Sequence, residues 1–185
     1  KEKYRPNGVP LSSEELQEMA HFFPIATLCN VKTSKVPIIE NPPFYPELQS
    51  VGIPLIDFSK MQGITFVDTI LISQARYPKQ HEWLPLIFHE LVHVIQYQLL
   101  GIDVFIEQYI KGFIEHSFSY ENIPLESNAY ELQNRYMIAP LKPFLVLLEV
   151  QRKLNIFWLK ERLVRAQNMK ILVETFLDFI PPNIY

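Results

Sequence analysis

The sequence predicts an α+β fold that is mainly helical, with a small N-terminal β-sheet or hairpin placed before one long apolar helix. Residues 81–101 lack internal glycine, are mostly apolar and end at Gly101, a pattern typical of a helix with a left-handed C-terminal cap. Residues 63–73 are rich in β-branched and aromatic side chains, which favours one strand or a tight hairpin turning at Asp68.

Length and charge restrict the class of protein. A chain of 185 residues with 48 % hydrophobic residues has enough apolar surface for one globular domain, which we assign to residues 1–185. The formal net charge of −3 provides no basic patch for nucleic acid, so we expect no nucleic-acid partner. The most apolar C-terminal window, residues 145–150, is too short for a transmembrane segment.

Cysteine content and the first residues bear on the cellular compartment. Cys29 is the single cysteine, which excludes an intramolecular disulfide and a cysteine-based metal site, and we expect its thiol to be buried. No apolar run follows the charged residues 1–6, so no secretory signal is evident in this chain. Localisation therefore stays open.

The N-terminal elements follow from capping and proline signals. Ser12 and Glu15 have the spacing of a capping box, which predicts a helix over residues 12–20 that ends before Pro24. Residues 27–36 contain a short strand candidate. Five prolines between residues 37 and 54 predict a stretch rich in loops.

Helices dominate the sequence after Gly101. We expect a helix over residues 102–116, a loop over 117–123 and a third helix over 125–136, which begins at Pro124. Residues 6–136 then form the core of the domain. Residues 140–185 form a C-terminal extension of two or three amphipathic helices, which would pack on the core or bind another protein.

The central helix carries an HExxH motif, residues 89–93. Residues four apart share one face of a helix, so the imidazoles of His89 and His93 can converge on one ion, and zinc accepts imidazole nitrogens. Glu90 is offset around the helix and can reach a metal-bound water, which is the position of a general base. Pro85 should lie in or near the first turn, where its missing N–H matters little.

An ordinary amphipathic helix is the alternative interpretation of this stripe. His89, His93 and Gln96 would also be neighbours on a solvent-exposed face. However, apolar residues occupy nearly every other direction of the helix, which favours an interior helix whose polar stripe faces a cleft.

A catalytic zinc site usually has a third protein ligand. The metzincin motif HExxHxxGxxH would need a glycine at position 96 and a histidine at position 99, where this chain has Gln96 and Leu99. The third ligand should therefore be a glutamate on a later helix. The candidates are Glu107, Glu115, Glu121, Glu126 and Glu131. Glu126 is favoured because it lies in the first turn of a helix that can pack against the HExxH helix.

Two segments together carry a resemblance to a known family. Residues 89–97 read HELVHVIQY, Gly101, Phe105 and Tyr109 follow, and residues 120–130 read YENIPLESNAY. This pattern resembles the small bacterial gluzincin-like metallopeptidase domain, a largely uncharacterised group with versions that accompany contractile injection systems. The resemblance runs from about residue 6 to residue 136 and is strongest from Ile64 onward.

The resemblance implies a zincin-like fold with Zn²⁺ held by His89, His93 and Glu126. It further implies hydrolysis of peptide bonds by a metal-activated water, with Glu90 as general base. Tyr130 stands where gluzincins often carry an acidic partner of the first histidine, so we expect either a phenol that contacts this imidazole or a core aromatic residue.

The donor to the developing oxyanion stays open at this stage. Tyr120, Tyr130, His116 and Arg135 are the candidates, and we expect His116 to interact with the carbonyls at its helix end instead. We expect His21 and His81 to be structural or surface residues, with His81 at most at the mouth of the cleft.

Two functions follow. The first is a zinc-dependent metallopeptidase that acts on a peptide or protein substrate lying along the edge strand before the HExxH helix. The second is a zinc-stabilised, non-hydrolytic module that binds a protein partner through its C-terminal helices.

Overall fold

The computed structural model describes residues 3–155 and residue 167. Lys1–Val150 form one compact unit and Gln151–Tyr185 a second, and every helix and strand with defined bounds belongs to the first. Beyond residue 155 the expected C-terminal helices lie outside the described residues, apart from residue 167.

The protein is a mixed α and β structure with a small four-stranded sheet, in agreement with the predicted α+β class. The strands are β1 (Val9–Pro10), β2 (Lys32–Val36), β3 (Gly63–Phe66) and β4 (Thr69–Ser73), in the order β1-β2-β4-β3. β2 and β4 run parallel, and the other two pairs are antiparallel. β3 is therefore an edge strand.

The expected hairpin over residues 63–73 is confirmed. β3 and β4 pair with Phe66 opposite Thr69, so Val67 and Asp68 form the turn. Val67 has a φ of 66°, in the left-handed region that a β-branched residue rarely adopts.

Three short helices occupy the N-terminal part. α1 (Ser13–Met19) begins with the predicted capping box between Ser12 and Glu15. α2 (Ile25–Asn30) and α3 (Tyr45–Ser50) were not expected. The short strand expected within residues 27–36 is confirmed as β2. The preceding helix α2, which begins after Pro24, was not predicted because six residues are too few to show a clear apolar period.

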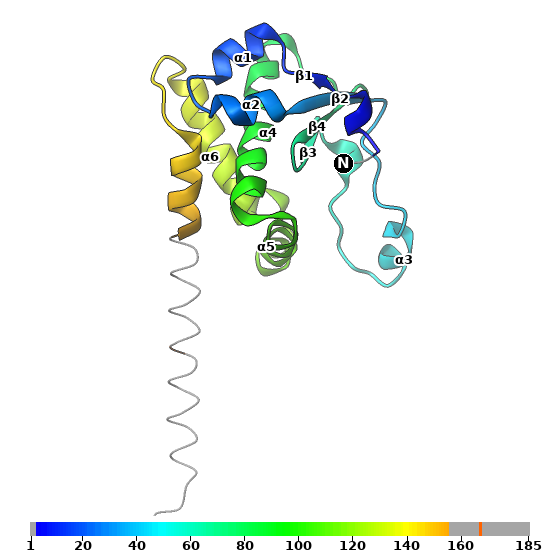
Figure 1. Ribbon diagram of the computed structural model, residues 1–185. Coiled ribbons are helices and arrows are strands. Elements are labelled where there is room, and N and C mark those ends of the chain that lie inside the picture. The colour runs from blue at the N-terminus through cyan, green and yellow to red at the C-terminus, as the bar shows by residue number, and fades with distance from the viewer. Residues whose placement is uncertain (1–2, 156–166, 168–185) are drawn as a thin grey trace, which may run out of the picture. The chain divides into compact units, whose positions relative to one another are not determined.

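Three longer helices form the rest of the unit. They are α4 (Gln80–Leu100), α5 (Ile102–Glu115) and α6 (Pro124–Ile138), and α4 contacts β3, α5 and α6 (Figure 1). Gly101, with a φ of 75°, joins α4 to α5 as predicted. Pro85 is the sixth residue of α4 and so lies in its second turn, one residue further in than a helix beginning at residue 81 would place it, because α4 begins at Gln80.

Burial supports the interior position of α4. Its residues 87–97 are all buried, and Phe88 packs with Phe22, Tyr136 and Phe144 in an aromatic core. The expectation of a buried Cys29 was wrong, since its thiol is exposed on α2. None of the helices among the described residues is both long and apolar enough to cross a bilayer.

Candidate metal centre

Three buried side chains from α4 and α6 converge at one point. Nε2 of His89 lies 3.2 Å from Oε2 of Glu126, Nε2 of His93 lies 3.4 Å from Oε1 of Glu126, and the two Nε2 atoms are 3.1 Å apart. All three residues are at most 5 % exposed. Their ligand atoms lie within 4.8 Å of one another, so the group could hold a metal ion. The packing of α6 on α4 places Glu126 over the HExxH motif, as predicted.

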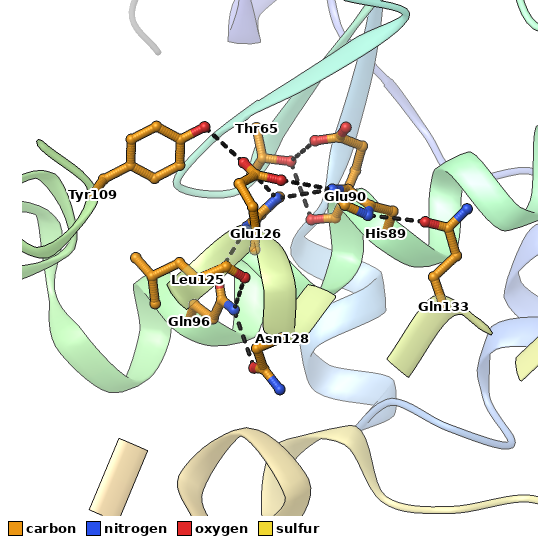
Figure 2. Close-up of polar contacts among 10 residues, drawn as sticks. Thr65, His89, Glu90, Gln96, Tyr109, Leu125, Glu126, Asn128 and Gln133 are labelled. Carbon is orange, nitrogen blue, oxygen red and sulfur yellow. Dashed lines mark hydrogen bonds and ion pairs between the residues drawn. The ribbon is translucent and has the colours of Figure 1, made fainter. Parts of the chain in front are cut away.

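The hydrogen bond at Nδ1 of each imidazole determines which ring nitrogen carries the proton. Figure 2 shows Nδ1 of His89 facing Oε1 of Gln133, at 3.0 Å. Nδ1 of His93 is 2.8 Å from Oε1 of Gln96. An amide oxygen only accepts, so each Nδ1 must donate its proton. In the neutral imidazoles both Nε2 atoms therefore present lone pairs toward the Glu126 carboxylate.

The amide orientation of Gln96 is set by two acceptors. Its Nε2 donates to the backbone carbonyl of Leu125 at 3.0 Å and to Oδ1 of Asn128 at 3.2 Å. Its oxygen must then face His93. Because Leu125 and Asn128 belong to α6, this buried amide also ties the two ligand-bearing helices together.

The Glu126 carboxylate accepts a hydrogen bond from a tyrosine. The hydroxyl of Tyr109, on α5, donates to Oε1 of Glu126 at 2.6 Å. Burial raises the pKa of Glu126, but the two histidines lower it by more, so the carboxylate is ionised at neutral pH. Burial lowers the pKa of His93, yet the Glu126 carboxylate and the other partners raise it overall to about 9.

Glu90 is buried next to the three ligand residues but points toward β3. The hydroxyl of Thr65 donates to its Oε2 at 2.7 Å, and burial raises the pKa of the Glu90 carboxyl. A Cβ on Gly63 would lie 2.9 Å from Oε1 of Glu90, so the glycine leaves room for this carboxylate. Edge strand β3 thus holds the carboxylate that was predicted to be the base.

Tyr130 and Tyr120 lie near the ligands in different ways. The Tyr130 ring packs against the imidazole of His89 with 4.5 Å between centroids, while the partner of His89 Nδ1 is Gln133. Tyr120 lines both of the cavities that Glu90 lines. Burial raises the pKa of Tyr130 to about 12 and that of Tyr120 further, so both phenols keep their protons at neutral pH.

Other candidate donors lie away from the three ligands. Nδ1 of His116 donates to the carbonyl of Gly112 at 2.8 Å, as expected of a residue at a helix end. Arg135 pairs with Glu149 at 3.0 Å and lies over the ring of Phe144, which removes it as an oxyanion donor. His81 is exposed at the wall of the cleft, and His21 is exposed.

The remaining glutamate candidates are all exposed, on α5, on α6 or in the segment between them. They are Glu107, Glu115, Glu121 and Glu131.

Two cavities meet at Glu90. A cleft of about 730 Å³ is lined by His89, Glu90 and several polar residues, among them Lys60 and Glu82. A neighbouring groove of about 770 Å³ is lined by Glu90, His93 and Glu126 and otherwise mostly by apolar residues.

The donor set fits a metal ion. Two imidazole nitrogens and one carboxylate are the ligands of many catalytic zinc sites, and three acceptors without an internal donor need a cation or a proton between them. The three converging residues and Glu90 had been singled out from the sequence. Sequence reasoning missed Gln133, Tyr109, Thr65 and Asn128.

Comparison of the chain with models of protein families, with curated proteins and with solved structures finds no match. The structure itself shows a mixed α and β protein with a buried group of His89, His93 and Glu126 that could bind a metal ion.

Proposed function

We propose that the chain is a zinc-dependent metallopeptidase of the gluzincin type with a zincin-like fold. The observation that carries the proposal is the position of Glu90, a buried carboxylate beside three converging acceptors that does not join them. His89, His93 and Glu126 would hold the metal. The substrate would be a peptide or protein.

The reaction is hydrolysis of an amide bond. When bound, zinc polarises the scissile carbonyl and lowers the pKa of water to about 7. Glu90 accepts a proton from the attacking water and passes it to the leaving amine as the C–O bond forms and the C–N bond breaks. Thr65 orients Glu90, and the phenols of Tyr120 and Tyr130 are the available donors to the developing oxyanion.

Glu90→Gln tests this function. The variant should keep the zinc content of the wild type, because Glu90 is not a ligand, and should lose hydrolysis of a peptide library. Glu107→Gln is the matched control, since Glu107 is exposed on α5. Hydrolysis by Glu90→Gln at the wild-type rate would contradict the role of Glu90 as base.

The hydrogen-bond partners of the two Nδ1 atoms favour a second candidate function. Gln133 and Gln96 are neutral, and an amide raises the basicity of an imidazole less than a carboxylate does. A zinc-stabilised, non-hydrolytic protein-interaction module would have such a site. In that case zinc removal lowers the melting temperature, and the zinc-loaded protein cleaves no peptide.

A further inference from the structure

We propose that the apolar groove beside the metal centre binds a large apolar side chain of the peptide substrate, next to the bond that is cleaved. This inference rests on the proposed function. It assigns a substrate class, peptides with an aromatic or long aliphatic residue at the cleavage site.

One wall of the groove is a stripe of isoleucines on α5. Ile106, Ile110 and Ile114 follow one another at four-residue spacing, share one helix face and are 45 %, 55 % and 55 % exposed. Phe44 and Ile53, from the loop that carries α3, lie in the opposite wall and are also exposed. Large apolar side chains gathered in this way around one cavity mark a binding site rather than ordinary surface.

The groove is continuous with the candidate metal centre. Glu90, His93 and Glu126 form part of its lining, and they are the only residues with formally charged or imidazole side chains among the described residues that line it. A charged substrate side chain would lose its hydration there without gaining a partner away from the reacting atoms. The volume of about 770 Å³ lies in the range of ligand pockets and accommodates a phenylalanine or leucine side chain.

The edge strand identifies the occupant as part of a peptide. β3 has a strand partner on one side only, and its Ile64 and Phe66 line the groove. An extended peptide can pair with such an edge and place alternate side chains on one face. The neighbouring cleft, which shares Glu90 with the groove, is also lined by Lys60 and Glu82, so it offers charged partners that the groove lacks.

Binding to zinc-loaded Glu90→Gln protein tests the groove without hydrolysis. The probes are fluorescently labelled peptides that differ at one position, with phenylalanine, alanine or glutamate there. Burial of a phenylalanine ring should give at least tenfold tighter binding than alanine, measured by fluorescence anisotropy. Equal affinities for the three peptides would overturn the proposal.

Groove variants provide the matched comparison. In the same background, Ile110→Ser should weaken binding of the phenylalanine peptide about tenfold and leave the alanine peptide unchanged. Ile114→Ser is a second test of the same wall of the groove. Ile25→Ser is the control, because Ile25 is 59 % exposed on α2 and does not line the groove. An equal effect of Ile110→Ser and Ile25→Ser would contradict the assignment.

Two further measurements separate the outcomes. If the wild type cleaves no library peptide while the Glu90→Gln protein prefers phenylalanine, the proposed hydrolysis fails, and the groove is a binding site for an apolar peptide side chain but not a substrate subsite. Cleavage without preference for apolar residues supports hydrolysis and overturns the groove assignment. If sedimentation shows a dimer that Ile110→Ser converts to a monomer, the occupant is a second copy and the proposal is wrong.

Discussion

The Nε2 atoms of His89 and His93 lie 3.1 Å apart, closer than two lone pairs can approach without a cation or a proton between them. Gln96 and Gln133 hold the Nδ1 protons on the opposite sides of the rings. Burial lowers the pKa of His93, but the charge and the hydrogen bond of the Glu126 carboxylate, with smaller contributions from Glu90 and Gln96, outweigh burial and raise it to about 9, so in the metal-free protein His93 keeps a proton at neutral pH. A bound metal ion would take the place of that proton.

Metal affinity should therefore depend on pH. Below about pH 9 the ion must displace the proton of His93, so the apparent zinc affinity should rise about tenfold per pH unit between pH 7 and 8.5. Competition with a chelator of known affinity measures this slope. An affinity independent of pH over this range would show that no proton is exchanged.

The same proton affects the stability of the metal-free fold. The pKa of His93 is raised from 6.5 to about 9, so its contribution to the free energy of unfolding is complete below pH 6.5 and is lost as pH rises through 9. Urea unfolding in the presence of a chelator should show a midpoint that falls from pH 6.5 to pH 9. His93→Gln should remove this part of the pH dependence.

The buried amide of Gln96 should matter more than that of Gln133. Gln96→Leu leaves Nδ1 of His93, the carbonyl of Leu125 and the amide of Asn128 without their partner. We expect zinc affinity to fall 10- to 100-fold and the unfolding free energy by about 1–3 kcal/mol.

Gln133→Leu is the comparison, since Gln133 is only partly buried and lines the cleft that contains Lys60 and Glu82. Water can replace its oxygen as the acceptor for His89, so the loss of affinity should be smaller. Equal losses in the two variants would contradict the role of Gln96 in joining α4 and α6.

The Thr65 hydroxyl should affect the acid limit of activity. Burial raises the pKa of Glu90, and the two histidines and the hydrogen bond from Thr65 lower it in part. Thr65→Val removes this bond, raises the pKa further and should shift the acid limb of the kcat/KM profile to higher pH, because Glu90 must be ionised to accept a proton. Thr65→Ser keeps the hydroxyl and should leave the limb in place, and zinc content should be unchanged in both.

Close contact between α5 and α6 depends on Gly112. A Cβ at this position would lie 2.6 Å from Cδ of Pro124, the first residue of the helix that carries Glu126. Helix propensity alone would make Gly112→Ala stabilising by about 1 kcal/mol. We expect instead a net loss of about 1 kcal/mol from overpacking, with weaker zinc binding as α6 is displaced. Ser127→Ala, exposed on α6, should change neither quantity.

Local patterns explain what the sequence could predict. The capping box at Ser12, the long apolar period around the HExxH motif and the β-branched run over residues 63–73 each depend on near neighbours in the chain. The three proposed ligands were found because two share a helix and the third opens the next helix but one. α2 and α3 were missed because helices of six residues have too few turns to display a period.

Long-range partners could not be predicted in this way. Thr65, Tyr109 and Gln133 contact Glu90, Glu126 and His89 only because β3 packs on α4, α5 on α6 and α6 on α4. Gln133 follows Glu126 by seven residues and so lies on the same face of α6, a spacing that could have indicated it. The exposed Cys29 was wrongly expected to be buried because its burial depends on which face of the unexpected helix α2 meets the core.

Along the chain, His93 precedes α5 and Glu126 follows it, so an ion bound by both would join two distant parts of the chain. An ion held by His93 and Glu126 would close a loop that contains α5 and the turn at Ser117 and Phe118, both with positive φ. If a protease cut that turn, the two pieces would each keep part of the ligand set. The ion would then act as a removable cross-link. A chelator would separate the two pieces of the cut chain, as a reducing agent separates two chains that are joined by a disulfide.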